Sequence, residues 1–457
     1  MKGNTVSRPA YLDTAADFIV GTRLADLSAD ALTHARWILA DCIPVMAAGM
    51  QTREMKAFVA AQLAQAAPGH SSVFGAGQRT SALDAGLLNG TAGTWLELDE
   101  GNLFAKGHPG IQVVPAALAV AQDRSAAGAD LLLAVALGYE VSARISRAAN
   151  VRLTIHPHGT YGVIGAAIAV GRLKGFDRVQ MRELLNVAAT MGMATSRNTL
   201  LEGSTVRNIF TGHSAFMGQT AARLVESGFT GGSDEVGWVY GRVLSDTFDS
   251  ARVVADLGRE WLVAKNYFKL HCIGRYAHSA VDALEDALAH APGGRIDPTA
   301  VERIDVTAYS LAAGLAGKNI TTSFGARFSI PFALATILHH GRSGTAEFEE
   351  AAVANPAVQA LVAKVFMRHE PEYDKAFPDR QLCDVVIRMR GGTTFTGRCE
   401  VTKGEPANPH KAEELEGKFM RLGTPVWGEA MTRKLLAGCM QIEKVPDFRA
   451  FTDSFEL

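Results

Sequence analysis

The stretch that decides the fold class is Val385-Val-Ile-Arg-Met-Arg390, which is followed by Gly391-Gly392 and by residues 393–401. Two runs of strand-forming residues around a Gly-Gly pair predict a β-hairpin. Another β-like segment lies upstream, where apolar residues stand among polar ones at Val301, Ile304, Val306 and Tyr309. The second half of the chain is therefore expected to contain strands.

The first 265 residues or so carry helical periodicity instead. Ser28 can cap a helix whose apolar face includes Leu32 and Ile38, and Pro44 is expected to kink or end that helix. Further stretches rich in alanine and glycine lie at residues 115–122, 130–148, 162–174, 182–194 and 214–227. Because no strand alternation is visible in this part, we expect it to be entirely helical.

These patterns predict a mainly α fold with two domains. A chain of 457 residues is too long for one ordinary hydrophobic core. Residues 1–268 are expected to form a helical domain, which residues 406–457 complete after the chain returns to helical periodicity. Residues 269–405 are expected to form an inserted, smaller α+β domain.

The composition is that of a globular protein without bulk attraction to polyanions. Charged residues make up 20% of the chain and the net charge is -2, so neither nucleic acid nor a membrane surface is an expected partner. No apolar run is long enough to span a bilayer, and the first residues lack an apolar signal segment, so a cytoplasmic enzyme is expected. The five cysteines form no C-x-x-C pair, and no disulfide framework is predicted.

The most informative polar stretch is residues 96–110, LELDEGNLFAKGHPG. It joins three carboxylates (Glu97, Asp99 and Glu100) to His108, which stands between glycine and proline. Carboxylates and a histidine on one loop can exchange protons with a substrate, which suggests acid–base chemistry. Equally, Asp99 and Glu100 can cap the helix that the following proline starts. The loop alone does not decide between the two interpretations.

A second polar segment is residues 155–162, IHPHGTYG, which leads directly into an apolar helix. Backbone amides at a helix start, with a histidine nearby, suit a carboxylate ligand. His156 and His158 form an H-x-H pair that can bind zinc, but zinc needs further ligands at a recognisable spacing, and the sequence offers none. We therefore predict no metal site here.

Two further segments supply cations. Arg207, in residues 202–213, can clamp a carboxylate at two points, or it is an ordinary surface arginine at a helix end. At the expected domain boundary, where pockets commonly form, several potential cations lie close together in the sequence: Lys269, Arg275 and His278.

Together the four segments describe a pocket with histidines as acid–base groups and fixed cations. Proton abstraction next to a carboxylate needs this combination, because cations must hold the charge that develops on the carboxylate oxygens. Motifs of nucleophilic hydrolases are missing, and so is a P-loop.

The segments, in this order, resemble the MmgE/PrpD family, which includes 2-methylcitrate dehydratase, iminodisuccinate epimerase and cis-aconitate decarboxylase. The resemblance covers nearly the whole chain. Its elements are an opening helix (residues 27–41), an acidic and H-P loop (89–110), an H-P-x-G-T segment (156–160), a K/R-x-x-x-x-G element from Arg207, a lysine followed by R-x-x-H (269–278), an F-S-x-P-Y-A-like run (328–333) and residues 403–419.

The resemblance implies a large all-helical domain with a smaller α+β lid, usually a homodimer, and neither a metal nor an organic cofactor. The catalytic residues that it implies are Asp99, His108, His156 and Lys269. The substrate-binding residues are Arg207, Thr160, Arg275 and His278. Departures from the family pattern are Trp95 for a frequent histidine, Glu100 for a second aspartate, Phe332 for a tyrosine, and Gly274 where the decarboxylase has an active-site histidine.

We therefore predict a cofactor-independent lyase that dehydrates a small di- or tricarboxylic acid such as a 2-methylcitrate-like substrate. His108 or His156 would remove the α proton, and the other histidine or Asp99 would protonate the departing hydroxyl. Arg207 and Lys269 would hold the carboxylates. The alternative is an epimerase of a dicarboxylate such as iminodisuccinate, which returns the proton to the opposite face. Gly274 argues against a cis-aconitate-type decarboxylase. A metal-dependent hydrolase built on His156 and His158, and a carboxylate binder without turnover, are the remaining alternatives.

Overall fold

The computed structural model describes residues 9–455, and it is mainly helical with two small β-sheets. The α-helices of the first part are α1 Ala10–Gly21, α2 Ala29–Met50, α3 Arg53–Leu63, α4 Ala82–Gly93, α5 Pro109–Arg124, α6 Gly128–Ala148, α7 Gly162–Lys174, α8 Arg178–Ala189, α9 Asn198–Leu201, α10 Ile209–Glu226, α11 Glu235–Trp238 and α12 Ser250–Val254. The later α-helices are α13 His278–Ala289, α14 Ser310–Ala313, α15 Ser323–Ala326, α16 Ile330–His340, α17 Glu350–Val353, α18 Pro356–Val362, α19 Pro371–Asp374, α20 Ala412–Trp427, α21 Glu429–Cys439 and α22 Phe448–Asp453. The strands are β1 Ser71–Val73, β2 Gln78–Thr80, β3 Val301–Ala308, β4 Val365–His369, β5 Cys383–Met389 and β6 Thr394–Cys399.

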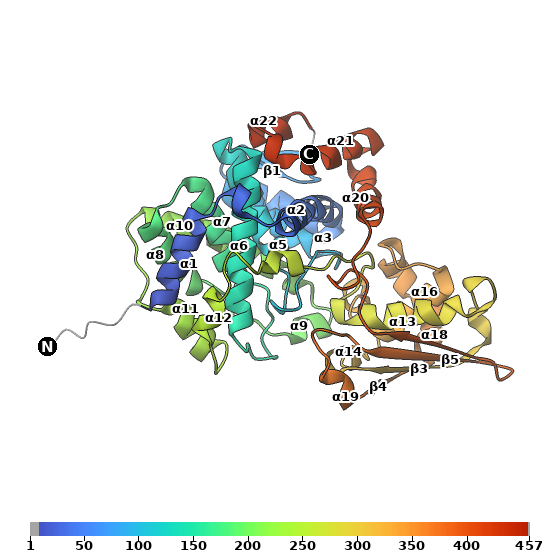
Figure 1. Ribbon diagram of the computed structural model, residues 1–457. Coiled ribbons are helices and arrows are strands. Elements are labelled where there is room, and N and C mark those ends of the chain that lie inside the picture. Colours follow the sequence, from blue (N-terminus) through green and yellow to red (C-terminus); the bar gives the residue numbers. More distant parts are fainter. Residues whose placement is uncertain (1–8, 456–457) are drawn as a thin grey trace.

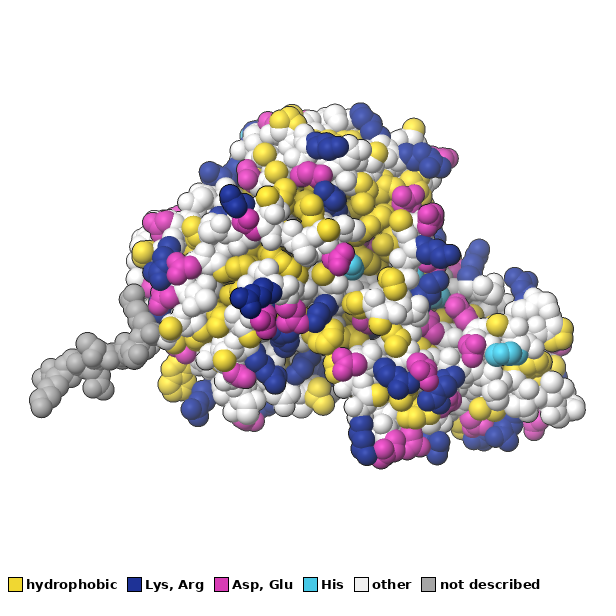
Figure 2. Space-filling model, viewed as in Figure 1, with side chains coloured by type: hydrophobic (Ala, Val, Ile, Leu, Met, Phe, Trp, Pro, Cys, Tyr) yellow, Lys and Arg dark blue, Asp and Glu magenta, His cyan; other side chains and the backbone are white. Residues whose placement is uncertain are grey.

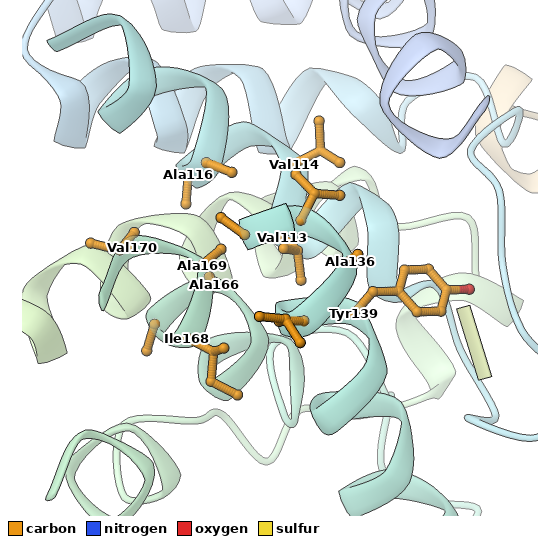
Figure 3. Packing of buried hydrophobic residues seen from close by; sticks show 14 of the residues in the cluster. Val113, Val114, Ala116, Ala136, Tyr139, Ala166, Ile168, Ala169 and Val170 are labelled. Carbon is orange, nitrogen blue, oxygen red and sulfur yellow. The ribbon is translucent and has the colours of Figure 1, made fainter. Parts of the chain in front are cut away.

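Small side chains let the central helices approach closely. Figure 3 shows this packing with residues of three helices: Val113, Val114 and Ala116 of α5, Ala136 and Tyr139 of α6, and Ala166, Ile168, Ala169 and Val170 of α7. A Cβ added at Gly138 on α6 would lie only 2.5 Å from the backbone oxygen of Gly165 on α7, so this crossing requires glycine. The tight packing gives a firm support for the polar loops that precede α5 and α7.

One expectation for the helical part is wrong, and of the two outcomes expected at Pro44 the structure excludes the end of the helix. Ser71–Val73 and Gln78–Thr80 form an antiparallel hairpin, so this part is not entirely helical. Strands of three residues are too short to produce a visible alternation. Pro44 does not end its helix, since α2 continues to Met50 with Pro44 buried inside it. Packing of the buried residues around Pro44 offsets the hydrogen bond that a proline removes.

The hairpin predicted around the Gly-Gly pair is confirmed. β5 and β6 pair antiparallel, and both Gly391 (φ 103°) and Gly392 (φ 89°) take backbone angles that favour glycine. The sheet has the order β4-β3-β5-β6, in which β3 is parallel to β4 and antiparallel to β5. In Figure 1, α13, α16 and α18 lie along one side of this sheet.

Buried apolar residues form two large clusters. The first cluster joins α1, α2, α4–α8 and α10 to the C-terminal helices through residues such as Phe419, Leu435 and Phe448. The second cluster holds the sheet together with α13 and α16, and it also includes Leu96 and Leu98. The acidic loop therefore lies where the two clusters meet. The domain boundaries at 268/269 and 405/406, and the lid function of residues 269–405, stay predictions.

Charges of both signs are scattered over the face drawn in Figure 2, without a large patch of one sign. Among the described residues, no helix is long and apolar enough to cross a membrane.

Candidate active site

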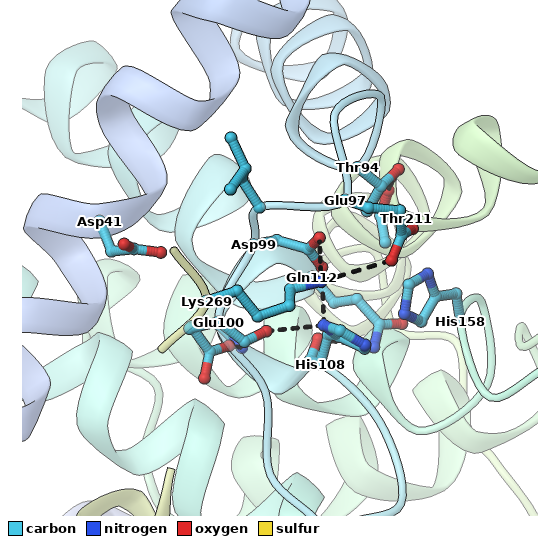
Figure 4. A network of polar contacts seen from close by, with 12 residues as sticks. Asp41, Thr94, Glu97, Asp99, Glu100, His108, Gln112, His158, Thr211 and Lys269 are labelled. Atoms are coloured by element: carbon cyan, nitrogen blue, oxygen red, sulfur yellow. Dashed lines mark hydrogen bonds and ion pairs between the residues drawn. The ribbon is translucent and has the colours of Figure 1, made fainter. Parts of the chain in front are cut away.

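The segment between α4 and α5 carries most of the ionisable groups of the site. It brings Glu97, Asp99 and His108 together with Lys269, which follows in sequence 161 residues after His108, as Figure 4 shows. Leu96 and Leu98 point into the second apolar cluster. The carboxylates of Glu97 and Asp99 instead contact Arg207, Lys269 and His108.

Glu97 joins Arg207, a predicted substrate-binding residue, to Lys269, a predicted catalytic residue. Its Oε1 lies 2.5 Å from Nη1 of Arg207, and its Oε2 lies 3.3 Å from Nζ of Lys269. Glu97 is buried and has a φ of 53°. For a residue with a Cβ this left-handed conformation costs on the order of 1 kcal/mol or more, and such strain concentrates at functional sites.

Asp99 connects Lys269 to His108. Its Oδ1 lies 3.2 Å from Nζ of Lys269, and its Oδ2 lies 2.8 Å from Nδ1 of His108. Burial by itself raises the pKa of Asp99, but the charges of His108 and Lys269 outweigh burial and hold this pKa well below its usual range. Asp99 is therefore a permanent anion beside the His108 ring.

The hydrogen bonds of His108 define its tautomer. Nδ1 lies 2.7 Å from the backbone carbonyl oxygen of Glu100, and a carbonyl oxygen can only accept. Nδ1 therefore carries the hydrogen, so the lone pair lies on Nε2 whenever Nε2 is unprotonated. The His108 side chain is 11% exposed whereas that of Asp99 is fully buried, so His108 is the member of the pair that a ligand can reach.

His156 is engaged at both ring nitrogens. Its Nε2 lies 3.1 Å from Nε of Arg207, and its Nδ1 lies 3.1 Å from the backbone nitrogen of His158, so both nitrogens face donors. A protonated His156 ring would carry a hydrogen on each nitrogen, and neither hydrogen would face an acceptor. Burial and then the charge of Arg207 lower the pKa of His156 well below its usual value. The ring is therefore neutral, and its nitrogens are less available to a substrate than Nε2 of His108.

His158 is a site residue that the sequence interpretation considered only as a zinc ligand. Its ring is fully buried, and it meets the rings of His108 and His156 edge-on, with centroids 4.9 and 4.6 Å away. Neither ring nitrogen has a hydrogen-bond partner among the described residues. The only signal in the sequence was the H-x-H pair.

Three of the predicted substrate-binding residues bond elsewhere. The hydroxyl of Thr160 donates to the carbonyl of Pro157 in its own loop, at 2.5 Å. Arg275 pairs with Glu405 through Nε and Nη2, at 3.0 and 2.7 Å. His278 contacts the carbonyl of Ile273 through Nε2, at 3.2 Å. These three residues support the surroundings of the site, and none of them makes a contact with the Glu97–Asp99–Lys269 group.

Glu100 performs the helix-capping role that was the competing interpretation of the acidic loop. Its Oε1 accepts the backbone N–H of Gly110 in the first turn of α5, at 2.6 Å, and its Oε2 accepts the hydroxyl of Tyr139, at 3.0 Å. Burial raises the pKa of Glu100 to about 8. The loop thus serves both purposes, because Glu100 caps the helix while Asp99 contacts His108.

Other site neighbours carried no recognisable motif. The side chain of Gln112 accepts from the backbone N–H of Gly159 and donates to the backbone carbonyl of His108, which ties the two histidine loops together. The rings of Phe324 and Phe328 lie 5.9 and 5.7 Å from the guanidinium carbon of Arg207. Phe324 and Phe328 both belong to the second apolar cluster.

Asp99, His108 and His158 offer ligand atoms that lie within 4.8 Å of one another, a spacing that would also suit a metal ion. Their surroundings do not favour one. Lys269 already neutralises Asp99, and the charges of Arg207 and Lys269 face the His158 ring. Glu97 and Asp99 already balance the charges of these two cations, so neither carboxylate is left over to compensate a metal ion.

Known proteins resemble this chain along most of its length. Residues 13–249 match the MmgE/PrpD N-terminal domain, and residues 271–442 match the MmgE/PrpD C-terminal domain. The cis-aconitate decarboxylase of Aspergillus terreus (strain NIH 2624 / FGSC A1156) is 23% identical over 92% of this chain and 91% of the relative. The cis-aconitate decarboxylases of Mus musculus and Homo sapiens are both 24% identical over 80% of this chain, which is 77% and 78% of the relatives.

Proposed function

The chain belongs to the MmgE/PrpD family, and we propose that it is a lyase that dehydrates a small di- or tricarboxylic acid. The observation that carries this proposal is the Asp99–His108 pair. The Glu100 carbonyl and Asp99 both contact Nδ1, which leaves the lone pair of Nε2 for a substrate proton. A buried anion behind the ring stabilises the imidazolium that proton abstraction creates.

The reaction would begin at the carbon next to a substrate carboxylate. Nε2 of His108 takes the α proton, and the electron pair of the broken C–H bond moves onto the carboxylate to give an enediolate. This electron pair then forms the C=C bond as the C–O bond at the β carbon breaks. The departing hydroxyl takes this same proton from the His108 imidazolium and leaves as water, which returns the ring to its neutral form. Lys269 and Arg207 supply the positive charge for the carboxylate oxygens. No step of this reaction needs a metal or an organic cofactor.

Gly274 argues against the activity named in the relatives. The family resemblance assigns an active-site histidine of the decarboxylase to this position. In this chain a Cβ at position 274 would lie 2.9 Å from Cδ1 of Phe328, so the ring of Phe328 fills the space that a side chain would need. The same ring lies over Arg207. The site is therefore built differently at this point.

We also propose that residues 269–405 act as a lid and that the protein is a homodimer. The lid is supported by Phe324 and Phe328, which cover Arg207, and by Arg327, whose Nη1 donates to the backbone oxygen of Leu96 at 3.1 Å. The homodimer follows from the family expectation, and light scattering should give twice the 48.6 kDa of one chain.

Proton NMR in heavy water tests the reaction. The protein is incubated with methylcitrate, citrate, aconitate, tartrate and iminodisuccinate in separate samples. Dehydration gives new olefinic signals, whereas deuteration at the α carbon with inversion would identify an epimerase. If none of these acids exchanges its α proton, the proposal is wrong.

His108→Asn tests the base. Asparagine retains a donor toward the Glu100 carbonyl but offers no lone pair in place of Nε2, so turnover should fall by about 100-fold or more. His340→Asn, at an exposed histidine far along the chain, is the matched control and should leave turnover unchanged.

A further inference from the structure

We propose that His158 is a second catalytic residue, whose ring hydrogen bonds the carboxylate oxygen that gains negative charge when the α proton leaves. The inference rests on the proposed function, since it places this oxygen next to the carbon that His108 deprotonates. It concerns a position that the family motif H-P-x-G-T leaves open, so it describes a feature of this chain's own pocket.

The first observation is the missing partner. A buried polar side chain normally has at least one hydrogen bond, because leaving it without one costs about 1–3 kcal/mol. The His158 side chain is fully buried, yet neither Nδ1 nor Nε2 has a partner among the described residues. The neighbouring rings of His108 and His156 meet it edge-on and do not satisfy these nitrogens.

The second observation is the charge around the ring. The side chains that face His158 with positive charge are Arg207 and Lys269, and the rings of His156 and His108 lie beside it. Burial, followed by these neighbours, lowers the pKa of His158 well below its usual value. The ring is therefore a neutral imidazole with one N–H donor near two cations. A carboxylate oxygen of Asp99 also lies within 4.8 Å of a His158 nitrogen, and Asp99 is already paired with Lys269. An oxygen that carries negative charge complements such a donor, and a cation does not.

The third observation is the position relative to the base. The centroid of the His158 ring lies 4.9 Å from that of His108, and Figure 4 shows the two rings adjacent to each other. A substrate whose α C–H faces Nε2 of His108 places its carboxylate one bond further away. The His158 ring lies beside both His108 and His156, and His156 contacts Arg207. The N–H of His158 is therefore positioned to reach this carboxylate, where the charge of the enediolate develops.

The test compares His158→Phe with His158→Asn. Phenylalanine keeps a ring of similar size without polar atoms, and asparagine keeps a donor. Removing one donor to a developing oxyanion typically lowers the rate by about 100- to 1,000-fold. We expect a loss of this size in α-proton exchange for His158→Phe, measured by NMR in heavy water on the same panel of acids, and a partial recovery in His158→Asn. His340→Phe, at an exposed histidine, is the control.

Thermal unfolding gives a readout without substrate. Replacing an unpartnered buried polar group by an apolar ring should leave the unfolding midpoint unchanged or raise it. A structural histidine would give the opposite result. A fall of the midpoint by about 5 °C or more, which corresponds to the loss of a real interaction, therefore overturns the proposal.

The outcomes separate the inference from the proposed function. If the unchanged protein exchanges an α proton and His158→Phe does so within threefold of its rate, His158 is not catalytic while the proposed function stands. If the unchanged protein neither exchanges nor binds any acid of the panel, both are wrong. If purified protein holds about one zinc ion per chain and His158→Phe loses it, His158 is a metal ligand, and the proposal is likewise overturned.

Discussion

At the scale of single residues, Glu97 changes how the pocket must be understood. Arg207 and Lys269 were expected to be free to bind substrate carboxylates, but Glu97 already contacts both cations. The two cations and the two carboxylates Glu97 and Asp99 therefore nearly balance in charge before a substrate arrives. A substrate carboxylate has to share or replace the contacts of Glu97.

Glu97→Gln tests this competition. Removing the anion leaves two buried cations less compensated, which should lower the free energy of unfolding by about 3 kcal/mol. It should also strengthen citrate binding, because the cations lose their internal partner. Urea unfolding measures the first effect and calorimetric titration with citrate the second. Glu302→Gln, at an exposed position, is the control, and weaker citrate binding in Glu97→Gln would contradict the competition.

At the scale of elements, the N-terminus of α5 is where the acidic loop gains its pH dependence. Burial raises the pKa of Glu100 to about 8, while an unfolded chain ionises this group near pH 4.3 as a rough reference value. Between these two pH values the folded protein therefore keeps a proton on Glu100 that the unfolded chain has released. The stability from Glu100 is complete below about pH 4 and is lost as the pH rises toward about 8.

Glu100→Gln should remove this dependence. Between pH 5 and 8, taken as a rough window, the unchanged protein should lose on the order of 1 kcal/mol of unfolding free energy per pH unit from this group. The glutamine variant should show a slope that is smaller by that amount. Urea unfolding of both proteins at several pH values gives the comparison, and equal slopes would rule out a protonated Glu100.

The C-terminal helix α20 supports the same loop from the other side. Nζ of Lys418 lies 2.5 Å from Oδ1 of Asp41 on α2 and donates to the backbone oxygen of Leu98, at 2.6 Å. Leu98 stands between Glu97 and Asp99. Helix α20 therefore holds the backbone that carries both carboxylates, although it lies more than 300 residues away in the sequence.

Lys418→Met should disturb both stability and activity. Asp41 would remain buried without its partner, which should cost about 3–5 kcal/mol of unfolding free energy. Turnover should fall as well, because the loop loses its anchor. In the double variant Asp41→Leu/Lys418→Met the unfolding free energy should recover in part while turnover stays low. Full recovery of turnover would show that the contact to Leu98 is dispensable.

At the scale of the whole molecule, the site is assembled from both apolar clusters. The first cluster positions the segments of His108 and His156, and the second supplies Phe324 and Phe328 above Arg207. The chain passes between the two predicted domains near residues 269 and 405. Arg275 connects these two segments, because it bonds to Glu405 and to the carbonyl of Lys403. An opening of the site would have to move the predicted lid, residues 269–405, as a unit about these two connecting segments.

Hydrogen exchange tests the lid. Bound citrate should slow amide exchange of residues 323–329, because closure over the ligand holds this segment in place. Residues 131–145 of α6, which are buried in either state, should not respond. Mass spectrometry with and without citrate measures both segments. Unchanged exchange at 323–329 while calorimetry reports bound citrate would contradict the lid.

Much of the architecture can be predicted from the sequence, because local patterns carry it. The hairpin around Gly391 and Gly392, the long helices and the return to helix after residue 406 each depend on neighbours in the chain. The β1–β2 hairpin and the continuation of α2 through Pro44 could not be predicted. Three-residue strands have no periodicity, and buried packing around Pro44 outweighs the local preference of proline.

For the site, the sequence by itself determined which residue types gather in one pocket and which family they belong to. Only the tertiary structure decided their roles. The Glu100 carbonyl fixes the tautomer of His108, Glu97 occupies the cations, and Arg275 turns toward Glu405, 130 residues away. Hydrogen bonds and ion pairs of this kind depend on distances between segments that are remote in the chain. No spacing within one segment encodes them, so the difference between His108, His156 and His158 becomes visible only in the folded protein.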